Sequence, residues 1–174
     1  MNKCADLHTD TAIQCVLRKY FDIPNAKIFR TENGKPYIDG NQIFFSVSHT
    51  KNALFLVFSD ENTGLDAEAI DRNVHYTPIV KKFCPAERKE ITSTELFLKH
   101  WTAKEATVKW LGGTLAKDLY KLDFVNGNMQ YGETSLPLVF VFLPFEDCIL
   151  CVCAEHLNNV SPYFEKIILE GEMI

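Results

Sequence analysis

Hydrophobic residues recur at helical spacing in two long stretches of the chain. In residues 9–22 apolar side chains return every three or four positions and Pro24 follows, so we predict a helix there. A second helix is predicted from about Ser93 to Leu111, with Gly112-Gly113 as its end signal. Its apolar face consists of Phe97, Trp101, Val108 and Leu111.

Short apolar runs bounded by turn residues predict strands between and after these helices. They cover about residues 43–47, 54–58, 64–68, 122–125, 138–143 and 149–154. Asn126-Gly127-Asn128 predicts a hairpin turn, and Gly34-Lys35-Pro36 predicts another turn. With a further helical pattern in residues 78–92, this order is typical of an α+β fold and not of repeated β-α units.

Composition and charge narrow the class of protein. The chain has 174 residues, of which 47% are hydrophobic and 24% charged, as in a globular protein of one domain or two small lobes. A net charge of -5 lacks the basic footprint that is typical of duplex nucleic-acid binding. No apolar run approaches the roughly 20 residues of a membrane-spanning helix, and the polar start lacks a signal-peptide core. We therefore expect a cytoplasmic protein with neither a nucleic-acid nor a membrane partner.

Three of the six cysteines, Cys148, Cys151 and Cys153, lie close together in one predicted strand. Their proximity suggests a zinc site, but no second Cys or His pair completes a tetrahedral ligand set. We expect buried apolar thiols, with metal or redox chemistry as the alternative.

Two groups of charged residues are candidates for chemistry. Asp66 and Glu68 lie two apart in a predicted strand, so both carboxylates face the same side and need a cation or a proton between them. Oxygen ligands of this kind suit Mg²⁺ with a phosphate substrate. Trp101, Glu105 and Lys109 share one helix face, where an acid can hold a cation and an ammonium can neutralise phosphate. The alternatives are a solvated strand face and an ordinary surface ion pair.

The segment Ser46-Val47-Ser48-His49-Thr50 follows an apolar strand and offers hydroxyl, backbone N–H and imidazole groups to a phosphate. Lys35 is a further candidate cation. A serine nucleophile with His49 as its base is the alternative, but the Gly-x-Ser-x-Gly motif of such enzymes is missing. A polar turn without a ligand is the other alternative.

Taken in order, four segments resemble the surfactin-type 4′-phosphopantetheinyl transferases. That family carries a Gly-Lys-Pro turn, a Ser-His-Ser segment, a Gly-x-Asp-x-Glu strand and a helix with a Trp-x-x-Lys-Glu-x-x-x-Lys pattern. The matching segments are Gly34–Ile38, Phe45–Thr50, Gly64–Glu68 and Trp101–Lys109. Here Ala67 replaces the usual aliphatic residue, Thr50 replaces the second Ser, and the N-terminal region is shorter than in typical members.

The resemblance implies an α+β fold of two similar α/β lobes, residues 1–62 and 63–174, that form a pseudo-dimer with a cleft between them. It also implies transfer of 4′-phosphopantetheine from coenzyme A to a serine of an apo acyl or peptidyl carrier protein. Adenosine 3′,5′-bisphosphate is then the released product.

The resemblance also assigns roles to residues. Asp66, Glu68 and Glu105 are expected to hold Mg²⁺, for which Mn²⁺ can substitute. Asp66, Glu105 and Lys109 are the expected catalytic residues, with Glu105 activating the carrier serine. The residues expected to bind coenzyme A are Lys35, Pro36, Ser48, His49, Lys104 and Lys109.

Carrier proteins are usually acidic, so their docking needs a local basic patch on this acidic chain. We predict it at Lys81, Lys82, Arg88 and Lys89 around Phe83. Two alternatives to the transferase remain open: a degenerate module that only binds carriers, and a Mg²⁺-dependent phosphohydrolase.

Overall fold

The computed structural model describes residues 3–40, 43–51, 53–71 and 75–157. Its helices and strands form the mixed α+β fold that the sequence predicts, with the described strands in four small sheets. The helices are α1 (Lys3–Phe21), α2 (Thr77–Val80), α3 (Pro85–Glu90), α4 (Thr94–Leu111), α5 (Leu115–Asp118) and the 3-10 turn η1 (Leu119–Lys121). The strands are β1 (Ile28–Arg30), β2 (Pro36–Ile38), β3 (Phe44–His49), β4 (Leu54–Ser59), β5 (Gly64–Ala69), β6 (Leu122–Val125), β7 (Asn128–Tyr131), β8 (Thr134–Ser135), β9 (Val139–Phe145) and β10 (Cys148–Ala154).

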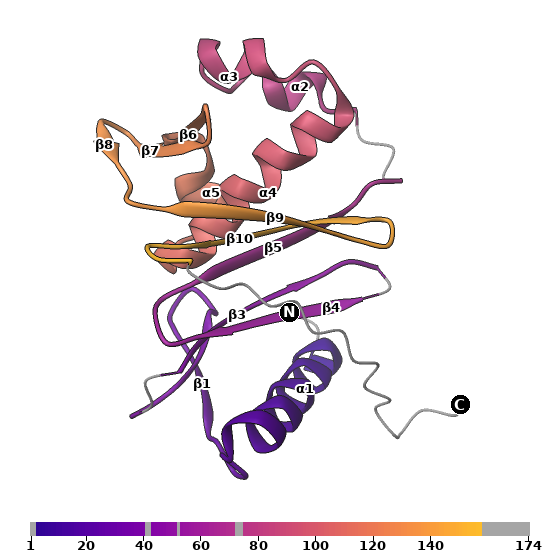
Figure 1. Ribbon diagram of the computed structural model, residues 1–174, viewed down its shortest axis with the longest axis vertical. Helices are drawn as coiled ribbons and strands as arrows, with labels where there is room; N and C mark the ends of the chain where they lie inside the picture. Colours follow the sequence, from indigo (N-terminus) through magenta and orange to yellow (C-terminus); the bar gives the residue numbers. More distant parts are fainter. Residues whose placement is uncertain (1–2, 41–42, 52, 72–74, 158–174) are drawn as a thin grey trace.

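The N-terminal part of the molecule consists of α1 and the hairpins β1–β2 and β3–β4 (Figure 1). Ile13 and Leu17 of α1 are fully buried against Phe45 of β3, which makes a separate small core. Gly34 takes a positive φ of 87° in the turn between β1 and β2, a conformation that glycine adopts without strain. The sequence predicted this turn but not the strands on either side of it.

The C-terminal part is built around the antiparallel sheet β5–β10–β9, with α4 lying along one face (Figure 1). The opposite face of β5 and β10 packs against Phe55 of β4, so the two parts share a core at this junction. Asn126 and Gly127 both have positive φ in the predicted hairpin, which joins β6 to β7. The arrangement of the two parts as a pseudo-dimer stays a prediction.

Helix α4 begins and ends as the sequence predicts. Ser93 Oγ accepts a hydrogen bond from the Leu96 N–H, and Gly112 ends the helix with a φ of 64°. At Gly64 the strand β5 touches the helix backbone, because a Cβ there would lie 2.0 Å from Ala106 O. Only glycine permits this close approach, which brings the acids of β5 beside Glu105 of α4.

Two local predictions need correction. Residues 78–92 do not form one helix, because Cys84 is extended before Pro85 and so separates α2 from α3. Leu111, expected on the apolar face of α4, is exposed.

Of the three cysteines expected to be buried thiols, Cys151 and Cys153 are buried, whereas Cys148 is only partly buried; none of the three forms a disulfide in the described part of the chain. No helix in the described part of the chain is long and apolar enough to cross a bilayer.

Candidate active site

Strand β5 and helix α4 bring three carboxylates together. Oxygen atoms of Asp66, Glu68 and Glu105 all lie within 4.8 Å of one another. Asp66 and Glu68 face α4, whereas Ala67 between them packs on the opposite side against Phe55 and other core residues. The strand alternation therefore places both acids of β5 in one site, as the sequence predicts.

Asp66 is the most deeply buried member of the cluster, with 3% of its surface exposed. Its Oδ1 accepts hydrogen bonds from Lys109 Nζ at 2.8 Å and from Ser48 Oγ at 2.9 Å, but its Oδ2 has no partner among the described residues. Burial raises the pKa of Asp66, although Lys109 opposes the effect. A buried carboxylate oxygen without a partner is unusual and fits a site that takes a cation.

Glu105 completes the case for a cation. Burial, followed by the charge of Asp66, raises the pKa of Glu105 to about 8. Three neighbouring carboxylates repel one another unless a proton or a cation lies among them. Their oxygens are the ligands that Mg²⁺ prefers, so the residues present fit a divalent cation.

Trp101, which the sequence places both in the apolar stripe of α4 and on the face of Glu105 and Lys109, lies at this site. It is only partly buried, and its indole Nε1 donates a hydrogen bond to Glu68 Oε1 at 3.1 Å. The same ring packs against Phe97, in agreement with its place in the apolar stripe.

A cavity of about 210 Å³ lies next to the acidic cluster. Lys35 Nζ donates to Asn62 Oδ1 at 2.9 Å and lies 3.5 Å from both Thr63 O and Trp110 O, and burial lowers its pKa to about 8. The cavity brings together three of the residues predicted to bind coenzyme A. Its lining residues are Asn33, Gly34, Lys35, Pro36, Ser46, Val47, Lys109, Gly112 and Gly113.

Two residues of the Ser-His segment that were predicted to bind coenzyme A, Ser48 and His49, lie outside this cavity. Ser48 is buried beside Asp66, and His49 is exposed at the end of β3. Neither is among the residues that line the cavity.

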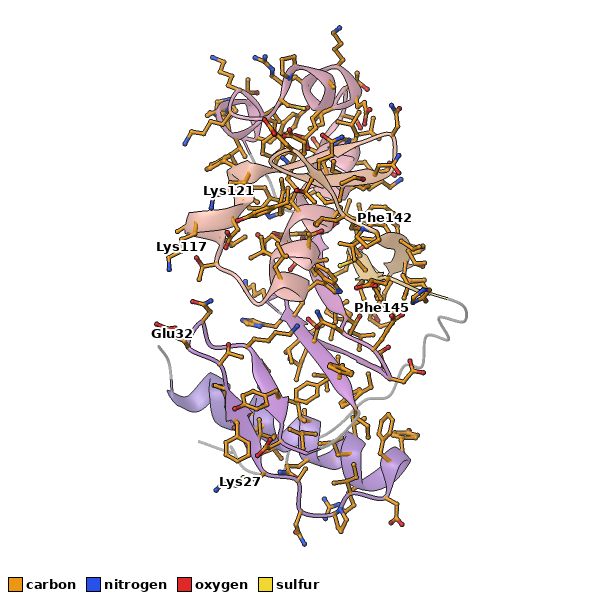
Figure 2. The ribbon with its side chains drawn as sticks, turned by 90° about the vertical axis from the view of Figure 1, so that its left-hand side faces the viewer. Lys27, Glu32, Lys117, Lys121, Phe142 and Phe145 are labelled. Carbon is orange, nitrogen blue, oxygen red and sulfur yellow. The ribbon has the colours of Figure 1, made fainter. Side chains whose placement is uncertain are left out.

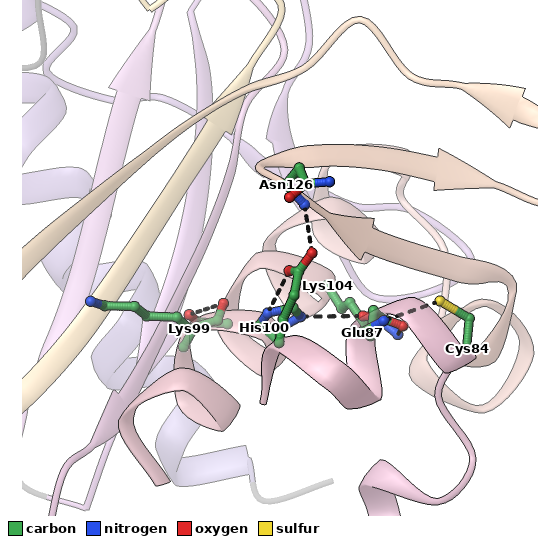
Figure 3. A network of polar contacts seen from close by, with 8 residues as sticks. Cys84, Glu87, Lys99, His100, Lys104 and Asn126 are labelled. Carbon is green, nitrogen blue, oxygen red and sulfur yellow. Dashed lines mark hydrogen bonds and ion pairs between the residues drawn. The ribbon is translucent and has the colours of Figure 1, made fainter. Parts of the chain in front are cut away.

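Lys104 does not join the cluster. It lies on another face of α4, is 1% exposed and pairs with Glu87 Oε2 at 2.8 Å (Figure 3). Its ammonium also lies 3.6 Å from the centre of the Phe83 ring, and His100 approaches the same Glu87. Adjacent residues on a helix point about 100° apart, so Lys104 cannot share the direction of Glu105. Its ammonium, predicted to bind coenzyme A, is instead buried in the contact with Glu87 and is not among the residues that line the cavity.

A family model of the 4′-phosphopantetheinyl transferase superfamily matches residues 62–150. The matched region begins just before β5 and includes all three acids, Lys109 and the whole of α4. No curated protein matches the chain significantly.

Proposed function

Because this chain belongs to the 4′-phosphopantetheinyl transferase superfamily, we propose that it transfers 4′-phosphopantetheine from coenzyme A to a serine of an apo carrier protein. The observation that carries the proposal is the cluster of three carboxylates, of which Asp66 is buried, beside a cavity lined by two lysines, Lys35 and Lys109. The ordered motifs support the surfactin-type branch, and with it two related lobes, residues 1–62 and 63–174, with the site between them.

We assign Asp66, Glu68 and Glu105 to hold Mg²⁺, which would neutralise the pyrophosphate of coenzyme A. Lys109 and Lys35 offer ammonium groups to phosphate oxygens in the adjacent cavity. His49, exposed at the end of β3, remains a candidate for an outer phosphate. Phosphoryl transfer depends mainly on positioning and charge neutralisation, and these side chains provide both.

In the proposed reaction, the carrier serine oxygen forms a bond to the β-phosphorus of coenzyme A. The bond from that phosphorus to the oxygen bridging to the α-phosphate breaks, and adenosine 3′,5′-bisphosphate leaves with the electron pair. Glu105 accepts the serine proton, which its ionised carboxylate can do when the cation is bound. Lys109 stabilises the charge on the leaving phosphate.

The predicted carrier surface changes in one respect. Its four cations are exposed, but Phe83 is only 4% exposed and cannot contact a carrier. The exposed ring of Tyr120 can supply the apolar contact instead of Phe83. It lies beside the basic residues, since Lys82 Nζ is 5.1 Å from the centre of the ring. Lys117 and Lys121 extend from the neighbouring α5–η1 segment (Figure 2). We propose this basic surface for an acidic carrier.

The test is mass spectrometry of apo acyl and peptidyl carriers after incubation with the protein, coenzyme A and Mg²⁺. We expect the carrier to gain the mass of 4′-phosphopantetheine, and expect no gain with excess EDTA or with Glu105→Gln. Carrier binding without a mass gain would support the degenerate module. Breakdown of coenzyme A without a carrier would support the phosphohydrolase.

A further inference from the structure

Two serines of β3 lie along an edge of β5. Ser46 Oγ accepts a hydrogen bond from the Leu65 N–H at 3.0 Å, and Ser48 Oγ accepts one from the Ala67 N–H at 3.1 Å. Both serines are buried. Strand β5 is the outer strand of its sheet, so these N–H groups point away from β10. The two hydroxyls therefore accept the hydrogen bonds that the carbonyl groups of a neighbouring strand would otherwise accept. These bonds connect β3 of the N-terminal part to β5 of the C-terminal part.

The two serines differ in what their hydroxyl hydrogens do. A hydroxyl that accepts one hydrogen bond still has a hydrogen to donate. Ser48 donates it to Asp66 Oδ1 at 2.9 Å, whereas in the described structure Ser46 makes no contact with the acidic cluster. Ser48 thus connects the backbone of β5 at Ala67 with the carboxylate of the preceding residue.

We propose that Ser48 is a positioning residue that orients Asp66 for a divalent cation. By occupying Oδ1 together with Lys109, it leaves Oδ2 without a partner among the described residues, in a carboxylate that has an oxygen within 4.8 Å of oxygens of Glu68 and Glu105. The proposal rests on the proposed function. It replaces the phosphate-binding role expected for Ser48, because this buried hydroxyl already has both an acceptor and a donor among its neighbours.

The two serines provide a matched pair for the experiment. Ser46→Ala and Ser48→Ala each remove one hydrogen bond to a β5 N–H, and Ser48→Ala also removes the one to Asp66, so both should lower the melting temperature and Ser48→Ala should lower it more. Removing a group that orients a metal ligand typically weakens metal binding about 10- to 100-fold. We therefore expect Ser48→Ala to weaken Mn²⁺ binding at least tenfold and Ser46→Ala to change it less than about twofold.

Mn²⁺ binding is measured by electron paramagnetic resonance without a carrier, and coenzyme A binding is measured separately by calorimetry. If Ser48→Ala does not fold, Ser48→Cys keeps the shape with a weaker donor and should weaken Mn²⁺ binding several-fold. If Ser48→Ala has unchanged Mn²⁺ affinity but binds coenzyme A more weakly, Ser48 binds phosphate as first expected, and the inference is overturned. Equal Mn²⁺ affinities of both alanine variants and the wild type would also overturn it, while leaving the proposed function intact. A wild-type protein without Mn²⁺ affinity would overturn both.

Discussion

Helix α4 carries two lysine–carboxylate pairs with the same N–O distance of 2.8 Å and very different surroundings. The Lys104–Glu87 pair is closed: both side chains are buried, and the ammonium is covered by Phe83. The Lys109–Asp66 pair is open: Lys109 is 30% exposed, and Asp66 retains an oxygen without a described partner. The distance between charges therefore does not distinguish the two pairs, whereas unsatisfied atoms and solvent access do.

The difference follows from the neighbours of each carboxylate. Burial raises the pKa of Glu87, but the hydrogen bond from His100 and the charge of Lys104 outweigh it, so the pKa lies below its usual range. The neighbours of Asp66 include two other acids, and burial keeps its pKa above the usual range. The charge of Glu87 is therefore compensated by its neighbours, whereas the charges around Asp66 favour the binding of a further cation.

Breaking the closed pair should have the largest effect. Lys104→Met leaves Glu87 buried without its main counter-charge and should lower the free energy of unfolding by about 3–5 kcal/mol, measured by urea denaturation. The double variant Lys104→Met/Glu87→Gln removes both charges and should recover much of that loss. If the double variant loses as much as the single one, the buried charge is not the cause.

Breaking the open pair should affect activity more than stability. Lys109→Met should lower kcat/KM by roughly 10²- to 10³-fold, about 3–4 kcal/mol of lost transition-state stabilisation. Its free energy of unfolding should fall by less than that of Lys104→Met, because burial already raises the pKa of Asp66 and a proton can replace the lost counter-charge. Lys99→Met is the matched control, because Lys99 forms an exposed pair with Glu95 on the same helix. Near-normal transfer by Lys109→Met would refute its assignment at the pyrophosphate.

The stability contributions of Glu105, in the acidic cluster, and of Glu87, in the closed pair, should also depend on pH with opposite signs. The pKa of Glu105 is raised to about 8, so the stability that its protonated form contributes is lost as pH rises from about 5 to 8. The pKa of Glu87 is lowered, so its contribution is lost as pH falls below the usual carboxylate range. Without metal, we expect the free energy of unfolding to fall by about 1–2 kcal/mol as pH rises through this range. This is less than the full change in the pKa of Glu105 implies, because Glu105 is partly exposed.

Thermal unfolding in EDTA from pH 4 to 9 measures both sides. Glu105→Gln should flatten the alkaline side and leave the acidic side unchanged. An alkaline loss that persists in Glu105→Gln would assign it to another group, with Asp66 as the first candidate because its pKa is also raised.

The smallest effect is expected at the surface beside the closed pair. Reversing Lys81 and Lys82 to Glu should raise the carrier KM a few-fold, mainly through slower association, and leave coenzyme A binding unchanged. The difference from wild type should shrink in high salt, which screens exposed charges beyond about 8–10 Å. An unchanged carrier KM at low salt would place docking on another surface.

The parts that sequence analysis predicted depend on local spacing. Strand alternation gave Asp66 and Glu68 a common face, and helical spacing placed Glu105 beside Lys109. The sequence could not show that Lys104 is buried, because this depends on α3 folding back onto α4. The only local indication was that Lys104 lies on a different face of the helix from Glu105 and Lys109.

The same reason applies to Ser48 and Trp101. A serine in a strand carries no sign of which neighbouring strand it will meet, and a tryptophan in an apolar stripe resembles a core residue until its indole N–H has a partner. Both contacts join elements that are distant in sequence, β3 to β5 and α4 to β5.

The contact at Gly64 has a consequence for which ions the site accepts. Strand β5 and helix α4 meet there backbone to backbone, which sets the distance between the two main chains that carry the acids. Mg²⁺ needs ligand distances of about 2.0–2.1 Å, whereas Ca²⁺ needs about 2.3–2.6 Å. If the proposed Mg²⁺ site is correct, a main-chain spacing of this kind would favour an ion of one size, and the core side chains could change over evolution without altering that preference.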